Sequence, residues 1–206
     1  MIFDADDERV EPNDYYSAYP STEHAWIYIA VDIRNMNITK VGLTTKEQPK
    51  KRIAEGKAYN PFITLFTTYE LSKCTYGVSR QELSDIEKNI HNRSVFGEPI
   101  KHLFTRRDSE WFHLDPEEAE YQVDSILAKR GFSVDGKSLY ASSECDISFH
   151  GIHVPRMRKI KTVFRPDARE FHDMARVSEI PYSYYRDYYT FLEEYHSRPA
   201  HEKPYD

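Results

Sequence analysis

A tyrosine, a glycine and an arginine lie at spacings that could form a phosphate site. Tyr28 lies in an apolar, β-forming segment, and Gly42 ends a second one. Arg52 follows Gly42 by ten positions, within a basic segment. The planar guanidinium of arginine can bind two non-bridging phosphate oxygens at once. Glycine lets the backbone approach a substrate closely. These residue types therefore indicate chemistry on a phosphate ester.

Four consecutive segments would position these residues. They are an apolar strand at 26–31, a turn at 35–37, a returning strand at 38–43 and a helix at 45–58 that Thr44 or Thr45 caps. Pro49 falls early in the helix, where a missing backbone N–H is tolerated. This order predicts a hairpin followed by a helix, with Tyr28, Gly42 and Arg52 at one end of a small sheet.

A third strand and a second helix follow. Residues 62–71 alternate and are rich in β-forming side chains. Ser79 and Glu82 have the spacing of a capping box, and the helix runs to about residue 91. Glu87 and His91 are four residues apart, so they share one face of this helix. Without further context, an acid on so polar a helix is more typical of a solvated face.

Four sequence motifs resemble the GIY-YIG nuclease family. Residues 26–28 (Trp-Ile-Tyr) correspond to Gly-Ile-Tyr, and residues 40–44 (Lys-Val-Gly-Leu-Thr) fit the Lys-Ile-Gly-x-Thr form of a phage-associated branch. That branch also carries a Glu four residues before a His on the second helix, and a later Glu-Trp-Phe strand, here at 110–112. Arg52 falls at the position of the family's catalytic arginine. The resemblance covers residues 26 to about 130.

The resemblance implies an α+β fold and a metal-dependent endonuclease that cuts DNA. The fold would be a small three-stranded, mainly antiparallel sheet flanked by helices, with a C-terminal α/β extension. Glu87 would hold one divalent cation, Mg²⁺ or Mn²⁺, because such an ion needs few protein ligands. Arg52 would hold the scissile phosphate, and Tyr28 would orient or deprotonate the attacking water.

The general base stays open, because Val41 replaces a second tyrosine that many family members have. The candidates are Tyr28, His91 and Lys40. A free tyrosine has a pKa of about 10 and is a poor base at neutral pH. Lys40 and Arg52 would therefore have to lower the pKa of Tyr28.

The charge pattern divides the chain into three predicted parts. The net charge is −6, and residues 1–23 hold seven acids against one arginine, so the remainder is close to neutral. We predict an acidic flexible arm at 1–22, a nuclease-like core at 23–131 and an extension at 132–206. The extension contains a basic run whose predicted DNA-backbone contacts are Arg156, Arg158, Lys159 and Lys161. A solvated edge strand is an equally acceptable explanation of that run.

Composition also bounds location and partners. No apolar run approaches the roughly 18 to 20 residues of a membrane span, and two cysteines make neither a disulfide framework nor a zinc site. We therefore expect a cytoplasmic protein, in the host cell if phage-encoded, with DNA as partner and no membrane contact. The tyrosine-rich segment 181–192 could bind a protein partner or form a homodimer. Two alternatives stay open: an RNA-directed nuclease, and a non-catalytic interaction protein acting as an anti-defence or regulatory factor.

Overall fold

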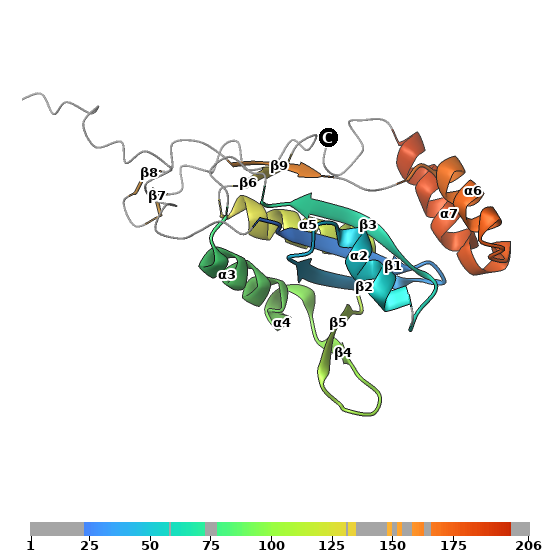
Figure 1. The fold of residues 1–206 in the computed structure, drawn as a ribbon, viewed down its shortest axis with the longest axis horizontal. Helices are drawn as coiled ribbons and strands as arrows, with labels where there is room; N and C mark the ends of the chain where they lie inside the picture. The colour runs from blue at the N-terminus through green and yellow to red at the C-terminus, as the bar shows by residue number, and fades with distance from the viewer. Residues whose placement is uncertain are drawn as a thin grey trace, which may run out of the picture.

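The fold is one β-sheet with helices on both faces (Figure 1). The computed structural model describes residues 23–57, 59–72, 78–130, 132–134, 148–149, 152–153, 158–162 and 166–198. The predicted arm at 1–22 lies outside these residues. Among the helices that are described, none is long and apolar enough to cross a bilayer. The predicted α+β class is confirmed.

Five antiparallel strands form the body of the sheet, in the order β4-β5-β2-β1-β3. The strands are β1 (Trp26–Asp32), β2 (Asn35–Thr44), β3 (Ile63–Glu70), β4 (Pro99–Lys101) and β5 (Asp108–Phe112). The predicted three-stranded sheet is therefore wrong in its strand count. Strands β4 and β5 are only three and five residues long. The Glu-Trp-Phe motif marked the end of β5 as a strand, but segments this short show too little alternation to indicate that they join the sheet.

The C-terminal part of the chain adds to the same sheet. Strand β9 (Arg158–Thr162) pairs antiparallel with β3, and β6 (Phe132–Val134) pairs parallel with β9. Strands β7 (Ser148–Phe149) and β8 (Ile152–His153) form a separate pair. Although β9 belongs to the predicted extension, its backbone therefore continues the sheet that holds Tyr28.

The turn of the β1–β2 hairpin is two residues earlier than predicted. The chain reverses at Ile33 and Arg34, and residues 35–37 already belong to β2. The Asp32 carboxylate fixes this turn, because it accepts hydrogen bonds from Arg34 N at 3.0 Å, Arg34 Nε at 2.9 Å and Asn60 Nδ2 at 2.9 Å. Asn35 and Asn37 resemble a turn in composition, but this side-chain network decides the position.

The helices predicted at 45–58 and 79–91 form, although α2 (Pro49–Lys57) begins four residues later than position 45, so neither Thr44 nor Thr45 is its cap. The second of them is α3 (Arg80–Ile90), and α4 (Arg93–Phe96) and α5 (Pro116–Ala128) follow it. Ser79 caps α3, where its Oγ accepts from Glu82 N at 3.1 Å. Asp115 caps α5 in the same way, accepting from Glu118 N at 2.9 Å. These caps satisfy backbone N–H groups that have no partner within the helix.

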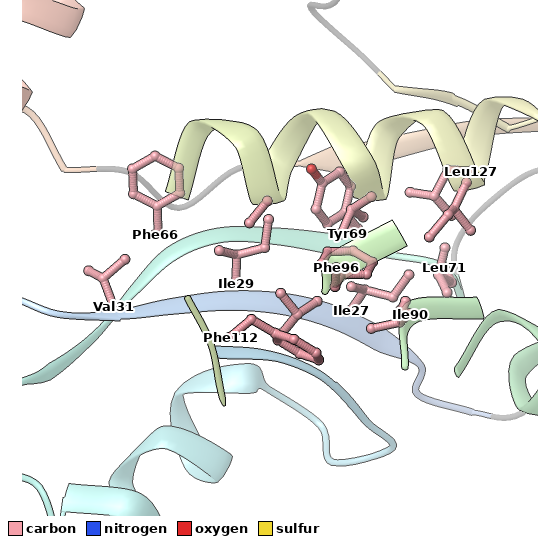
Figure 2. Close-up of a cluster of buried hydrophobic side chains, with 14 of the residues drawn as sticks. Ile27, Ile29, Val31, Phe66, Tyr69, Leu71, Ile90, Phe96, Phe112 and Leu127 are labelled. Atoms are coloured by element: carbon pink, nitrogen blue, oxygen red, sulfur yellow. The ribbon is translucent and has the colours of Figure 1, made fainter. Parts of the chain in front are cut away.

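Alternation along β1 sorts its side chains between two hydrophobic clusters. Ile27, Ile29 and Val31 belong to the main core, where β3, α3 and α5 also contribute (Figure 2). Tyr28 and Ala30 belong to a smaller cluster on the other face, which includes Ile53 of α2. A strand shows alternate residues to opposite faces of its sheet. Tyr28 is thereby directed toward the helix that carries Arg52.

Two antiparallel helices end the described chain. They are α6 (Ala168–Val177) and α7 (Tyr182–Ser197), at the right-hand end of the molecule in Figure 1. Tyr185 and Tyr188 of α7 are buried in the main core, whereas Tyr182 and Tyr184 are about half exposed. Part of the tyrosine-rich segment thus packs within the fold. Its predicted role in binding a protein partner or a second copy stays a prediction.

Candidate functional site

Tyr28 lies at the centre of the candidate site. Its side chain is fully buried, and its hydroxyl donates a hydrogen bond to Glu110 Oε2 at 3.3 Å. Gly42 is the direct partner of Tyr28 across the β1–β2 ladder. A Cβ atom at Gly42 would come within 2.6 Å of the Tyr28 hydroxyl and 3.1 Å of Glu110 Oε2. Glycine is therefore needed here for the tyrosine, whose hydroxyl fills the space that the missing side chain leaves.

Glu110 joins this tyrosine to a lysine. Its Oε2 atom lies 2.6 Å from Lys40 Nζ, while 32% of the Glu110 side chain and 18% of the Lys40 side chain are exposed. One carboxylate oxygen thus faces both the ammonium group and the phenol. The pair connects β2 to β5 and forms one wall beside the Tyr28 hydroxyl.

Glu110 was not among the predicted site residues. The Glu-Trp-Phe motif marked its strand, but nothing in the motif assigned a role to its carboxylate. The β2–β5 ladder pairs Thr39 with Phe112 and Lys40 with Trp111, so Glu110 lies just beyond the paired residues. Strict alternation would place Glu110 on the same face as Phe112, away from Lys40. Its carboxylate reaches Lys40 nevertheless, which the alternating pattern could not indicate.

Burial keeps the Tyr28 phenol protonated. Desolvation raises the pKa of Tyr28 well above the ordinary tyrosine value, and the negative charge of Glu110 raises it further. Arg52 lies beside the phenol and acts in the opposite direction, but its effect is smaller. Arg52 therefore lowers this pKa as expected, but the expectation that Lys40 and Arg52 together bring it below the ordinary value is wrong. It overlooked the free energy needed to bury a phenolate and the presence of a second anion.

The neighbouring groups remain charged. Burial by itself would raise the pKa of Glu110, but Lys40, Arg52 and His91 outweigh burial and bring it below its usual value. The contact with Tyr28 is the largest cause that raises the pKa of Arg52. The Arg52 side chain is 42% exposed and also contacts Glu55 Oε2 at 3.4 Å. A carboxylate and two cations therefore surround a neutral phenol.

The remaining predicted residues lie at different distances from this centre. His91, at the C-terminal end of α3, is exposed and close enough to Glu110 to affect its pKa. Glu87 is one turn earlier on α3, is exposed, and its carboxylate makes no hydrogen bond or ion pair with the described residues. No contact in the described part of the chain joins Glu87 to Tyr28 or Arg52.

The predicted basic contacts are not at this centre. Arg156 lies outside the described residues. Three of the four residues are on β9, two strands across the sheet from β1: Arg158, Lys159 and Lys161. Neighbouring strands are about 4.8 Å apart, so the backbone of β9 is roughly 10 Å from that of β1. Their role in binding DNA stays a prediction.

We expect Glu110→Gln to lower the pKa of Tyr28. The substitution removes the negative charge that disfavours the phenolate, whereas burial, the larger cause, remains. The new pKa should therefore fall but stay above the ordinary value of about 10. NMR titration of tyrosine labelled with ¹³C at Cζ would measure it, with the Tyr28 signal assigned from Tyr28→Phe. Glu98→Gln is the control, and an unchanged or higher Tyr28 pKa in the Glu110 variant would refute this account.

Comparison with known proteins identifies one domain family. Residues 25–127 match the family model of the T5orf172 domain. No curated protein and no solved structure matches the chain. The matched region extends from the start of β1 to the end of α5 and so contains Tyr28, Arg52 and Glu110. This family is a different one from the GIY-YIG nucleases, so the resemblance to those enzymes stays a prediction.

Proposed function

The chain belongs to the T5orf172 domain family, and for this member we propose a metal-dependent endonuclease activity that hydrolyses phosphodiester bonds in DNA. The proposal rests on the site and not on the name of the family. The observation that supports it best is the convergence of Arg52 and Glu110 on the buried Tyr28 hydroxyl, with Lys40 paired to Glu110. These four side chains come from three strands and a helix.

Arg52 is the group best suited to bind the scissile phosphate. A guanidinium has five N–H donors, and the contacts of this side chain with Tyr28 and Glu55 leave some of them for a ligand. With 42% of its side chain exposed, Arg52 can meet a phosphate without leaving the tyrosine. Tyr28 acts as a positioning residue in this proposal, since its hydroxyl lies between the Arg52 guanidinium and the Glu110 carboxylate.

Glu87 fits the role of metal ligand better than Glu110 does. The Glu110 carboxylate is already neutralised by Lys40, whereas Glu87 is exposed and without an ion pair in the described part of the chain. The described residues form no group of three or more potential metal ligands. A cation here would rest on one carboxylate and on water, which is a common arrangement for Mg²⁺. The bound ion would neutralise negative charge on the phosphate and on the leaving oxygen.

His91 is the best candidate for the general base. Tyr28 is a neutral phenol and cannot accept the proton, and Lys40 is ion-paired to Glu110. An imidazole can accept a proton near neutral pH, and His91 is exposed beside Glu110. In the proposed reaction the water oxygen bonds to phosphorus and its proton passes to His91. The bond from phosphorus to the 3′ oxygen breaks, and that oxygen takes a proton from solvent.

A binding protein without catalytic activity is the second candidate. Val41, at the position of the missing second tyrosine, is fully buried in the main core and cannot contribute to the site. Lys40 and Glu110 also neutralise each other. On this alternative the same surface would bind a protein or nucleic acid without a metal requirement.

We expect the wild-type chain to nick supercoiled plasmid DNA with Mg²⁺ or Mn²⁺, and Glu87→Gln to need a higher metal concentration. Loss of a residue that only hydrogen-bonds to a metal ligand already weakens metal binding by roughly 10- to 100-fold. Loss of the ligand itself should therefore raise the metal concentration needed for nicking by at least about 10-fold. The measurement is the nicking rate against metal concentration. Asp85→Asn is the matched control, because Asp85 is on the same helix but is bound to Gln81 and Lys88.

Each alternative gives a different outcome. Equal metal dependence in the Glu87→Gln and wild-type chains would remove Glu87 as the ligand. Cleavage of RNA but not DNA would assign the chain to the RNA-directed alternative. Binding without cleavage of any nucleic acid, at high protein concentration with either metal, would favour the non-catalytic candidate.

A further inference from the structure

The loop between β4 and β5 carries two apolar side chains in solvent. We call residues 101–107 the hairpin tip; they connect the two strands at the lower end of the molecule in Figure 1. Leu103 is 72% exposed and Phe104 is 93% exposed. A single exposed apolar side chain is common, but two neighbouring ones form a patch of the kind that marks interaction sites. The position at the end of a projecting hairpin leaves both side chains accessible to a partner.

The hairpin tip is also strongly positive. It contains Lys101, Arg106 and Arg107 and has no acidic residue. None of these three cations makes an ion pair within the part of the chain that the structure describes. Arg93 of α4 differs, since it lies 2.7 Å from Asp108, the first residue of β5, and 3.1 Å from Glu98. The charge of Arg93 is therefore compensated, whereas those of the hairpin tip are available to an anionic partner.

The hairpin tip has a defined backbone. His102 N donates to Arg107 O at 2.9 Å, and Arg106 N donates to His102 O at 2.9 Å. Arg106 has a φ of 57°, which lies in the left-handed region and tightens the turn. Preformed geometry reduces the entropy lost when such a loop binds. Phe104 is thus displayed at the end of a structured turn.

We propose that the hairpin tip is a DNA wedge, in which Phe104 inserts between adjacent base pairs of a duplex while Lys101, Arg106 and Arg107 bind the flanking phosphates. This proposal rests on the proposed function. Inserted apolar side chains unstack base steps and kink the duplex, and basic residues supply the backbone contacts. The combination of an exposed aromatic group with uncompensated cations matches that chemistry. A protein-docking surface would not need three free cations around its apolar centre.

The wedge would act close to the cleaved bond. Phe104 in the hairpin tip and Glu110 in β5 are six residues apart, so at most about 20 Å of extended chain separates them. This distance corresponds to roughly six base pairs at about 3.4 Å per pair. Insertion there would bend the duplex beside the scissile phosphate. The preferred substrate would then be DNA that deforms easily, such as sites with flexible pyrimidine–purine steps or mismatches.

The test uses the full chain and duplexes that contain 2-aminopurine at successive positions, with EDTA present to prevent cleavage. Fluorescence of this base analogue rises when it is unstacked, so the wild-type chain should give an increase at one step. Phe104→Ala should remove the increase and weaken binding by about 10-fold, the lower part of the range for one stacked base. Phe104→Trp should retain it. Tyr182→Ala, an exposed aromatic substitution on α7, is the control.

Binding in increasing salt tests the cations separately. Replacing Lys101, Arg106 and Arg107 by alanine should lower the slope of log affinity against log salt by about 3, since each phosphate contact contributes about 0.9. If the wild-type chain binds and nicks DNA but these variants behave like it, the wedge is refuted and the proposed function stands. That result would also be expected if the hairpin tip docks a protein. If the wild-type chain binds no DNA, both proposals fail.

Discussion

The Arg52→Lys chain is expected to nick plasmid DNA at least about 100-fold more slowly than the wild-type chain. Loss of a single preorganised donor to developing negative charge commonly lowers a rate by 10² to 10³. Lysine keeps the positive charge but lacks the planar fork that can contact Tyr28 and a phosphate at the same time. Nicking assays at saturating metal, with the rate measured as a function of DNA concentration, would quantify the effect.

The neighbouring Lys51 provides the control for this substitution. Lys51 is on the same helix, is more exposed than Arg52 and pairs with Glu47. Lys51→Ala should leave the nicking rate nearly unchanged. If it slows nicking as much as Arg52→Lys does, α2 contributes only its general positive charge, and the specific role proposed for Arg52 is refuted. Thermal unfolding should be nearly unchanged in both variants, because exposed ion pairs on a helix contribute little.

Gly42→Ala is expected to destabilise the fold by about 1–3 kcal/mol, as inserted atoms do in close-packed sites, and to abolish the Tyr28–Glu110 hydrogen bond. The new methyl group would meet the Tyr28 hydroxyl at 2.6 Å and Cζ at 2.7 Å. Tyr28 is completely buried and cannot rotate into solvent. Either the phenol moves away from Glu110 or the two strands separate. Chemical denaturation measures the stability change, and the NMR signal of Tyr28 reports its surroundings.

Gly56 offers a matched comparison on α2. A Cβ at this position would have no atom within 4 Å, and alanine favours a helix over glycine. Gly56→Ala should therefore stabilise the fold slightly, the opposite sign from Gly42→Ala. Adding Tyr28→Phe to Gly42→Ala removes the nearest atom and should restore part of the stability, but not the nicking activity. Equal stability of the Gly42→Ala and wild-type chains would contradict the close approach of the Tyr28 hydroxyl to Gly42.

Local patterns in the sequence predicted those elements whose interacting residues are close together along the chain. The β1–β2 hairpin followed from two β-forming segments around a turn signal, and α3 followed from the capping pair Ser79 and Glu82. Tyr28 and Gly42 also met as predicted, because they are direct partners in one hairpin. In each case the interacting residues are close along the chain, so spacing alone carried the information.

Long-range pairing and burial could not be obtained in this way. Glu110 reaches Tyr28 across 82 positions of sequence, and only the docking of β5 on β2 brings them together. The pKa of Tyr28 depends on how completely the sheet and α2 exclude water, which a sequence does not state. The exposed tip of the β4–β5 hairpin was likewise missed, since Leu103 and Phe104 resemble core residues by composition.

Strand β5 is attached to the rest of the sheet by a ladder of only two residue pairs, Thr39 with Phe112 and Lys40 with Trp111. The central strands are joined over nearly their whole lengths. Short peripheral elements open by themselves at a lower free energy than the core. Detachment of β5 would carry Glu110 away from Lys40, but it would also withdraw Phe112, which is buried in the main core. The packing of Phe112 thus anchors a strand that the ladder alone holds at only two residue pairs, and the position of Glu110 depends on that packing.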